Sequence, residues 1–303
     1  MTEHHRYGYH PWPERARWTW PGGATLAVYL GLNLEHFHFG EGLGAELAPG
    51  ANGGGGPQPD VLNYAWRDYG NRVGAWRVLE MLDELALPCT VLANSAMYRH
   101  APQLMAAHRA RGDEVAGHGR TNSERQSTLP EAEERALIAE ATETIAHHEG
   151  TAPRGWLSPW IAESRATPDL LRAAGYRYTL NWCSDDQPVW HSTRAGRLLA
   201  VPYGQEINDI PAIVARKDGA REFAEMIVDD FDERLRQVRD GRAQVMGIAL
   251  HPYLIGQPYR LRALRGALEH ILRRRAEVWI CTAGAIHDHV LTLPPGSVAG
   301  DAV

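Results

Sequence analysis

The stretch Thr25–Leu32 reads TLAVYLGL, and the polar residues Asn33 and Glu35 come directly after it. A short apolar run of this kind predicts a strand that is covered on both faces, as the strands of parallel sheets are. In barrel enzymes, the carboxyl ends of such strands carry the catalytic residues. This stretch therefore predicts an α/β fold and also one corner of a functional site.

Similar short runs recur along the chain and alternate with longer amphipathic segments. The predicted strands are Thr25–Leu32, Cys89–Ala93, Asp113–Ala116, Arg154–Leu157, Arg177–Trp182, Leu198–Pro202, Gln244–Leu250 and Glu277–Cys281. The predicted helices are Trp76–Leu85, Ala101–Arg111, Pro130–His148, Pro168–Ala174, Ala220–Arg239 and Arg260–Arg274. Repeated strand–helix units imply parallel strands with right-handed crossovers. We therefore expect a distorted (β/α) barrel of about 7 to 8 strands.

The length of 303 residues suits one large domain. We expect residues 1–303 to form a single barrel domain with an N-terminal extension over residues 1–22 and a glycine-rich loop over residues 40–59. That loop follows the first predicted strand. It is compatible with a flexible insertion and with a lid over a site at the strand end.

Composition excludes several classes of protein. A net charge of −6 argues against a protein that coats nucleic acid. The N-terminus lacks the apolar segment of a secretory signal, and no stretch is apolar for long enough to span a membrane. Cys89, Cys183 and Cys281 are far apart and form no CxxC pair. This spacing favours reduced thiols in the cytoplasm over disulfides or a cysteine-built zinc site. We expect a cytoplasmic protein with no nucleic-acid or membrane partner.

Polar and aromatic side chains follow nearly every predicted strand. Because the carboxyl ends of the strands meet at one face of a barrel, we expect these side chains to form one site. The candidates are Asn33, Glu35, Asn94, His118, Asn122, Trp156, Ser158, Trp160, Asp185, Asp186, Tyr203, Glu206 and His251.

The sequence leaves structural alternatives open for these candidates. Glu35 and His118 are compatible with a buried structural pair, and His251 with a loop histidine whose hydrogen bonds are satisfied. Asp185-Asp186 is typical of a turn or a helix cap. Only their occurrence at successive strand ends favours a shared site.

Short motifs stand in a characteristic order along the chain. They are Asn33-Leu34-Glu35, Gly117-His118-Gly119, Arg154-Gly155-Trp156, Asp185-Asp186-Gln187-Pro188, Val201-Pro202-Tyr203, Glu206-Ile207-Asn208-Asp209 and Leu250-His251-Pro252. From about Pro21 to His289, the chain resembles the polysaccharide deacetylase (NodB-homology) superfamily of carbohydrate esterases. It is most similar to the cytoplasmic branch of allantoinase-like and cyclic imide hydrolase-like enzymes. The resemblance implies a distorted barrel, hydrolysis of an amide C–N bond and a homo-oligomer.

The resemblance also bears on metal binding. Metal-dependent members carry an aspartate pair after the first strand and His-x-x-x-His after the third, and these residues hold a divalent ion, usually zinc. The corresponding positions here are Asn33, Glu35, His118 and Asn122. A zinc site, if one is present, would comprise Glu35, His118 and Asn122, which is an incomplete set of ligands. No cofactor is therefore expected.

The resulting hypothesis is the ring opening of a small cyclic amide or imide. Glu35 would activate water as the general base, assisted by His118. His251 would protonate the leaving nitrogen, with Asp185 or Asp186 tuning its pKa. The candidate substrate-binding residues are Asn33, Asn94, Asn122, Trp156, Ser158, Trp160, Tyr203 and Glu206.

Two other functions remain open. A metal-dependent N-deacetylase of an amino sugar or polysaccharide would contain stoichiometric zinc. A catalytically inactive barrel would bind its ligand without turnover. Trp156 and Trp160 favour a flat ring over a long glycan if they form the wall of a pocket, but they are equally compatible with core positions.

Overall fold

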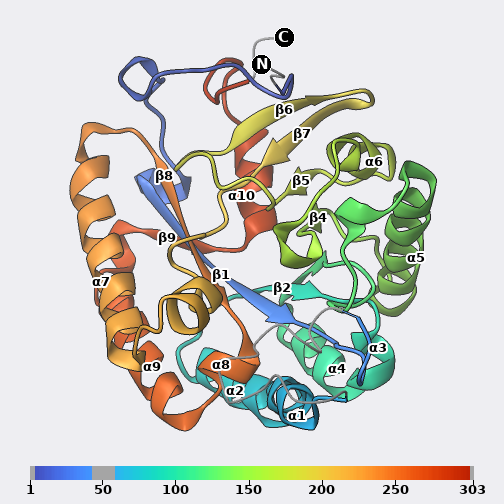
Figure 1. Ribbon diagram of the computed structural model, residues 1–303. Coiled ribbons are helices and arrows are strands. Elements are labelled where there is room, and N and C mark those ends of the chain that lie inside the picture. The colour runs from blue at the N-terminus through green and yellow to red at the C-terminus, as the bar shows by residue number, and fades with distance from the viewer. Residues whose placement is uncertain (1–3, 43–58, 301–303) are drawn as a thin grey trace.

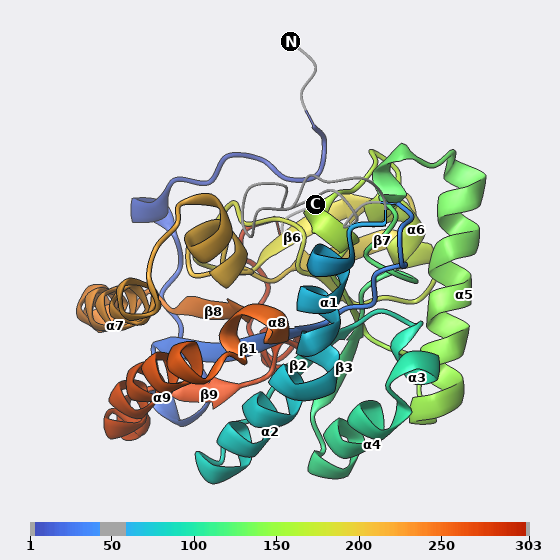
Figure 2. The ribbon, with the colours of Figure 1, turned by 60° about the horizontal axis from the view of Figure 1, so that its bottom comes forward.

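The computed structural model describes residues 4–42 and 59–300. A sheet runs through the middle of the molecule, and the helices lie around it (Figures 1 and 2). The strands are β1 Leu26–Leu34, β2 Thr90–Ala93, β3 Glu114–Gly117, β4 Gly155–Trp156, β5 Tyr178–Thr179, β6 Val189–Thr193, β7 Gly196–Ala200, β8 Gln244–Leu250 and β9 Trp279–Cys281. The α-helices are α1 Val61–Tyr69, α2 Ala75–Glu84, α3 Met97–His100, α4 Pro102–Arg111, α5 Glu131–Glu149, α6 Thr167–Ala173, α7 Ala220–Gln237, α8 Pro252–Ile255, α9 Pro258–Arg273 and α10 Ala283–Val290.

The sheet has the order β6-β7-β5-β4-β3-β2-β1-β8, and β9 also pairs with β1. Its pairs are parallel except for the antiparallel β6–β7 hairpin. Within the described ranges, backbone hydrogen bonds do not close the sheet into a complete barrel. The distorted (β/α) barrel expected from the sequence is confirmed. Most of the glycine-rich loop 40–59 lies outside the described residues.

Strand β1 is the centre of the sheet. On one side it pairs with β8 from Leu26 to Leu32, and on the other with β9 and then, from Gly31 onward, with β2. All nine residues of β1 are buried, which explains the nearly continuous apolar run in its sequence. Because of this position, Asn33 and Glu35 lie where several strands end.

The helices cover the sheet with apolar stripes. In α7 the residues spaced by four, Phe223, Ile227, Phe231 and Leu235, are all buried, as the sequence predicts. The sequence did not predict β6, which pairs with β7 in an antiparallel hairpin at one end of the sheet. The helices α1, α3, α8 and α10 were also not predicted; they are short, and α3 and α8 span four residues each.

A close helix contact positions the start of α8. Residues Gly70–Gly74 form one turn of π-helix between α1 and α2, and this turn packs against α8. A Cβ atom on Gly70 would lie 2.7 Å from the backbone nitrogen of Tyr253, and one on Gly74 would clash with the carbonyl oxygen of Pro252. The two backbones touch because glycine has no side chain. His251 immediately precedes α8, so this contact also fixes its backbone.

The described part of the N-terminal extension wraps around the barrel. The indole of Trp20 is buried, donates a hydrogen bond to the carbonyl of Gln244 at 2.9 Å, and stacks on Trp279 with ring centroids 5.5 Å apart. Nearer the terminus, Arg6 forms an ion pair with Asp169 at 2.9 Å. The tryptophans of this segment therefore pack against their own chain. No helix in the described ranges has the length and apolar character needed to cross a membrane.

Candidate active site

The carboxyl ends of β1, β3, β7 and β8 meet at a cavity of about 260 Å³. Apolar residues, including Leu157, Ile161 and Pro211, form part of its wall. The structure brings together at this cavity the predicted residues Asn33, Glu35, His118, Asn122, Trp160, Tyr203 and His251.

Glu35 lies at the centre of the polar side of the cavity. Its Oε1 atom accepts a hydrogen bond from the amide nitrogen of Asn122 at 2.6 Å. The same atom lies 3.4 Å from Nε2 of His118 and 3.6 Å from Nε2 of His251. Its Oε2 atom has no hydrogen-bonding partner in the described ranges. The carboxylate is therefore held through one oxygen and keeps acceptor capacity on the other.

His118 is held in one orientation by a backbone carbonyl. Its Nδ1 atom lies 2.7 Å from the carbonyl oxygen of Leu157. A carbonyl oxygen can only accept a hydrogen bond, so Nδ1 carries a proton. The Nε2 atom, which faces Glu35, therefore carries the lone pair whenever the ring is neutral.

His251 is held by a buried carboxylate, that of Asp209. The Nδ1 atom of His251 donates to Asp209 Oδ1 at 2.6 Å, and its backbone N–H donates to Oδ2 at 2.7 Å. Asp209 is completely buried. The ring is therefore fixed in orientation, with Nε2 turned toward Glu35. A carboxylate behind an imidazole in this way stabilises the imidazolium form.

The charges in the site oppose the effect of burial. Burial disfavours the charged form of Glu35, but His251, His118 and Arg67 outweigh it, and the pKa of Glu35 is lowered. Burial likewise disfavours protonated His251, but Asp209 and Glu35 outweigh it and raise the pKa of His251. Both shifts favour an ionised carboxylate beside an imidazolium.

Arg67 supplies one of these charges from outside the cavity wall. It lies on α1, is buried, and has its guanidinium 4.2 Å from the ring centroid of Phe37 and 5.3 Å from that of Tyr253. Aromatic faces stabilise a cation in this position. Arg67 was not among the predicted site residues, because α1 was not predicted.

Asn33 and Tyr203 form a neighbouring pair. The amide nitrogen of Asn33 donates to the hydroxyl oxygen of Tyr203 at 2.8 Å and to the carbonyl of Leu250 at 3.1 Å. Burial is the largest cause that raises the pKa of Tyr203, so its hydroxyl stays protonated. Because the hydroxyl oxygen accepts from Asn33, its hydrogen remains available to a group in the cavity.

A chain of amides fixes the orientation of Asn122. The backbone N–H of His36 donates to Oδ1 of Asn94 at 2.8 Å, and Nδ2 of Asn94 donates to the carbonyl of His118. That nitrogen also donates to Oδ1 of Asn122 at 3.0 Å. The NH₂ group of Asn122 must therefore point at Glu35. Asn94 lies behind the cavity wall and supports Asn122 from there.

This orientation does not fit a zinc site. Of the three candidate ligands, Glu35 offers a carboxylate oxygen and His118 a ring nitrogen, but Asn122 offers an NH₂ group, which cannot bind a metal. The amide oxygen of Asn122 already accepts from Asn94. Across residues 4–42 and 59–300, no group of three or more His, Cys, Asp or Glu side chains is arranged to hold a metal ion.

Trp160 and Ile161 form a strained part of the wall. Both have left-handed backbone conformations, with φ of 64° and 54°, which are unfavourable for residues with side chains. The indole nitrogen of Trp160 donates to the backbone carbonyl of Asn122 at 3.0 Å. The prediction that Trp160 lies at the site is supported by its position in the cavity wall.

Trp156 and Ser158 lie in the core, so their predicted contact with substrate is wrong. Both side chains are completely buried. The indole nitrogen of Trp156 donates to Oγ of Ser158 at 3.1 Å, and Asn181 donates to the same oxygen at 2.9 Å. Trp156 packs against Tyr176 on the α5 side of the sheet. Trp156 ends strand β4 and points into the core, whereas Trp160 lies in the 3₁₀ turn that follows, Pro159–Ile161.

Three predicted carboxylates lie away from the cavity. Asp185 pairs with Arg15 of the N-terminal extension, and Asp186 pairs with Arg234 of α7 at 2.6 Å. The backbone carbonyl of Asp186 also accepts from Val245, near the beginning of β8 and therefore at the opposite end of the barrel from His251. The predicted tuning of His251 by Asp185 or Asp186 is therefore wrong, and Asp209 takes this place.

The prediction that Glu206 binds substrate is also wrong. Its side chain is 80% exposed and pairs with Arg216 at 3.0 Å, while the neighbouring Gln205 and Asn208 line the cavity. Asn208 forms a β-bridge with Ala249 of β8. This bridge brings Asp209 next to His251. The acidic residues of the Glu206–Asp209 motif could be found in the sequence, but which of them faces inward depends on this bridge.

Comparisons with known proteins agree with this architecture. The polysaccharide deacetylase family model matches residues 63–179. A Schizosaccharomyces pombe protein assigned as a polysaccharide deacetylase is 27% identical over 293 residues, covering 87% of this chain and 89% of its own. The peptidoglycan deacetylase of Helicobacter pylori is 22% identical over 275 residues, covering 80% of this chain and 91% of its own.

Among solved structures, the PuuE allantoinase is similar over most of both chains. It superimposes with a TM-score of 0.78 and 26% sequence identity, covering 89% of this chain and 91% of that one. The fold and the relatives define the class of protein as a hydrolase of non-peptide C–N bonds. The chain is thus similar to polysaccharide deacetylases over residues 63–179 and in its relatives, and its structural neighbours include the PuuE allantoinase.

Proposed function

We propose that this protein opens the ring of a small cyclic amide or imide by hydrolysing a C–N bond. The observation that carries the proposal is a small cavity, about 260 Å³, in which the Glu35 carboxylate faces the His251 imidazole at 3.6 Å. This volume is slightly below the range for small-molecule sites, roughly 300–1,000 Å³. It suits a single ring, whereas a polymeric glycan needs an open groove.

Glu35 is the proposed general base. Its lowered pKa keeps it ionised, and Oε2 has no partner in the described part of the chain. A water molecule beside the carboxylate would transfer its proton to Glu35 while its oxygen bonds to the substrate carbonyl carbon. The hydrogen bond from Asn122 to Oε1 holds the carboxylate in place during this step.

His251 is the proposed general acid. Its Nδ1 atom is bound to Asp209, so the proton that it can release is on Nε2, on the side of the cavity. When the C–N bond breaks, this proton passes to the leaving nitrogen. The products are a carboxylic acid and an open-chain nitrogen group, so one water molecule is consumed in each turnover.

Tyr203 is the proposed donor to the developing oxyanion. Its hydroxyl oxygen accepts from Asn33, which directs the remaining hydrogen toward the cavity. A neutral phenol is a suitable donor to an oxyanion. Trp160, Leu157 and Pro211 supply flat and apolar walls for the two faces of a ring.

A turnover screen tests this proposal. We expect the purified chain to hydrolyse at least one member of a panel of five- and six-membered cyclic imides, hydantoins and allantoin. The activity should survive a strong chelator, because no step uses a metal ion. Tyr203→Phe should lower kcat while retaining the fold. Turnover of N-acetyl sugars that is abolished by chelation and restored by zinc would instead support a metal-dependent N-deacetylase.

The N-deacetylase is the second candidate, because the two relatives described above carry deacetylase names. It requires a third metal ligand that Asn122, in its present orientation, does not supply. Zinc measured in the protein at one equivalent would favour this candidate. Ligand binding without turnover of either panel would favour an inactive barrel.

A further inference from the structure

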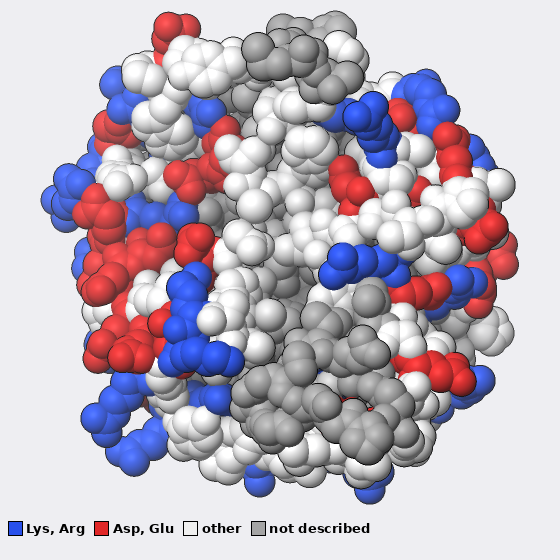
Figure 3. All heavy atoms as spheres, in the orientation of Figure 1, with Lys and Arg blue, Asp and Glu red and all other residues white. Residues whose placement is uncertain are grey.

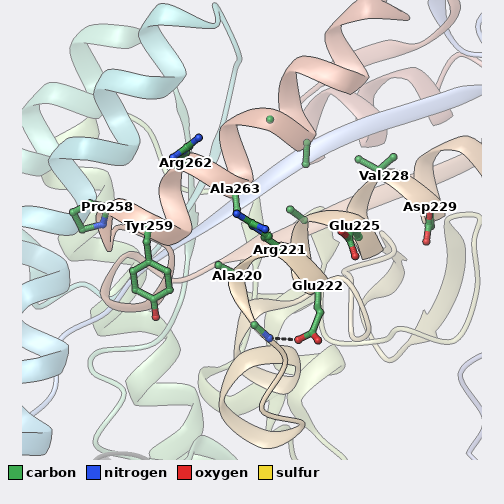
Figure 4. A pocket seen from close by; sticks show the side chains of 14 residues that line it. Ala220, Arg221, Glu222, Glu225, Val228, Asp229, Pro258, Tyr259, Arg262 and Ala263 are labelled. Atoms are coloured by element: carbon green, nitrogen blue, oxygen red, sulfur yellow. Dashed lines mark hydrogen bonds between the residues drawn. The ribbon is translucent and has the colours of Figure 1, made fainter.

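A larger hollow, of about 1040 Å³, lies between α7 and α9, but its lining does not suit a neutral ring (Figure 4). Charged side chains of both signs line it: Arg221, Glu222, Glu225, Asp229 and Arg262. Acidic side chains gather over α7, with arginines beside them, in the space-filling view (Figure 3). A small neutral ring offers no charge to these groups. The active-site cavity suits such a ring better, because neutral amides also line it.

Three asparagines line the active-site cavity, and two of them donate to groups of the protein. The NH₂ group of Asn33 donates to Tyr203 at 2.8 Å and to a backbone carbonyl at 3.1 Å. That of Asn122 donates to Glu35 at 2.6 Å. Asn208 differs from both. Its side chain is buried, with 4% exposed, and no described residue accepts a hydrogen bond from its NH₂ group.

The amide of Asn208 is held in one orientation. The backbone N–H of Ile210 donates to its Oδ1 atom at 3.1 Å, so the oxygen is turned toward the backbone and the NH₂ group toward the cavity. The backbone of Asn208 is also held, by the bridge to Ala249 and by the N–H of Ala212, which donates to its carbonyl at 3.1 Å. This donor is therefore fixed before a ligand binds.

A cyclic imide has a carbonyl on each side of its nitrogen, whereas a lactam has only one. Tyr203 is the proposed donor to the carbonyl that water attacks, and His251 is the proposed donor to the nitrogen. Asn208 lies on the His251 side of the cavity, because its bridge partner Ala249 is two residues before His251. We propose that Asn208 selects the substrate by donating a hydrogen bond to its second carbonyl, the one that water does not attack. This inference rests on the proposed function and narrows it to rings with two such carbonyls.

The kinetic signature of this role differs from that of a structural role. The second carbonyl keeps its bonding while the first is attacked, so a contact with Asn208 stabilises the bound substrate and the transition state about equally. Its loss should raise KM and leave kcat nearly unchanged. A merely structural role would lower kcat as well, because Asn208 adjoins Asp209, which holds His251.

Two probes that differ by one carbonyl test the proposal. Succinimide has a carbonyl on each side of its nitrogen, and 2-pyrrolidinone has the same ring with one carbonyl. In the Glu35→Gln variant, which lacks the proposed base, succinimide should bind about tenfold more tightly, since the lactam leaves the NH₂ group of Asn208 without a partner. Ligand-observed NMR titrations give the two dissociation constants.

Asn208→Ser, added to Glu35→Gln, should remove this preference. Serine can still accept from the N–H of Ile210, so the turn should persist, but its side chain is too short to reach the second carbonyl. The affinity for succinimide should fall about tenfold. Unchanged binding of 2-pyrrolidinone would show that the cavity is intact. With Glu35 present, Asn208→Ser should raise KM for succinimide about tenfold. The control Glu225→Gln, at an exposed position on α7, should change none of these values.

The outcomes separate this inference from the proposed function. Turnover of succinimide with the same KM in Asn208→Ser would overturn the inference and leave the ring-opening function. A preference for succinimide that depends on Asn208, in a chain that turns over no cyclic ring, would overturn the ring-opening function and keep Asn208 as the donor to the second carbonyl. Equal binding of the two probes, or binding of neither, would overturn the inference.

Discussion

At the residue scale, the chemistry of the site depends on contacts that hold Glu35 and His251 in opposite charge states. Burial alone would neutralise both groups. His251, 3.6 Å away, is the main cause that lowers the pKa of Glu35, and Asp209, followed by Glu35, raises the pKa of His251. The two groups are therefore coupled, and a change at one of them should be detectable at the other.

Replacement of Glu35 by glutamine should remove the proposed base. Glutamine retains the size of the side chain and can still contact Asn122, so the fold should persist. Turnover of the identified cyclic substrate should fall by about 10²–10⁴-fold, the usual contribution of a general base. Steady-state kinetics measures this loss, and circular dichroism controls for folding. Undiminished kcat in the variant would exclude Glu35 as the base.

The pH dependence of kcat/KM should follow the two shifted groups. Activity needs ionised Glu35, whose pKa is lowered. The acidic limb of the pH–rate profile should therefore lie below the usual pKa range of a carboxyl group. It also needs protonated His251, whose pKa is raised, so activity should be lost only above the ordinary range of histidine.

Asp209→Asn tests the basic limb. The substitution removes a negative charge beside His251, so the pKa of the ring should fall and the basic limb should move to lower pH. The charges that remain around the ring are those of Glu35 and Arg67. A pH–rate profile for wild type and variant makes the comparison. A basic limb that stays in place would show that it reports another group.

Asn122→His should create the ligand set that the wild-type chain lacks. The new imidazole would stand four positions after His118, with Glu35 adjacent, giving two imidazoles and one carboxylate. Elemental analysis after dialysis should find zinc near one equivalent in the variant and far less in the wild type. Stoichiometric zinc in the wild-type protein would contradict the orientation of Asn122 described above.

Sequence reasoning located the site residues that follow predicted strands, because the carboxyl ends of parallel strands meet at one face. Glu35, His118 and His251 were found in this way. It did not separate Asp209 from Asp185, because both are carboxylates in loops and only the bridge between Asn208 and Ala249 turns Asp209 inward. Long-range pairing of this kind leaves no local pattern in the sequence.

At the scale of the element, the contact between the π-helical turn and α8 supports His251 from behind. Gly74→Ala should force α8 away, because the added methyl group meets the carbonyl of Pro252. Such overpacking costs typically about 1–3 kcal/mol of unfolding free energy. Urea denaturation should show this loss, and kcat should fall as well, since His251 immediately precedes α8.

Gly266→Ala, on α9, is the matched control for Gly74→Ala. It also replaces a helical glycine, but its methyl group meets open space among the described atoms. In dilute solution it should stabilise the chain by about 0.5–1 kcal/mol, because alanine loses less backbone entropy in a helix. If Gly74→Ala were as harmless as the control, the close backbone contact would not exist in solution.

The long helices and the parallel strands were predictable because their patterns are local. In α7, an apolar residue at every fourth position is sufficient to define the buried face. The hairpin β6–β7 was not predictable. Strand β6 contains Trp190, His191 and Ser192 and shows no simple alternation of apolar and polar residues. Its strand conformation comes from pairing with β7 and not from its own composition.

At the scale of the whole molecule, the described part of the N-terminal extension packs against the barrel. Trp20 links the two through its contacts with Gln244 and Trp279. Trp20→Ala should lower the unfolding free energy by about 3–5 kcal/mol, as for other large buried aromatic residues. A single urea transition at lower denaturant concentration would show this. An unchanged midpoint would mean that the extension is not docked in solution.

The left-handed backbone at Trp160 and Ile161 has a consequence for engineering. The two conformations cost roughly 1–3 kcal/mol each, yet they put an indole into the cavity wall. Glycine at position 160 would relieve the strain and remove the wall in one step. Laboratory selection for heat resistance alone should therefore drift toward variants with a wider and less discriminating pocket. Selection that also rewards turnover would retain the tryptophan despite its cost.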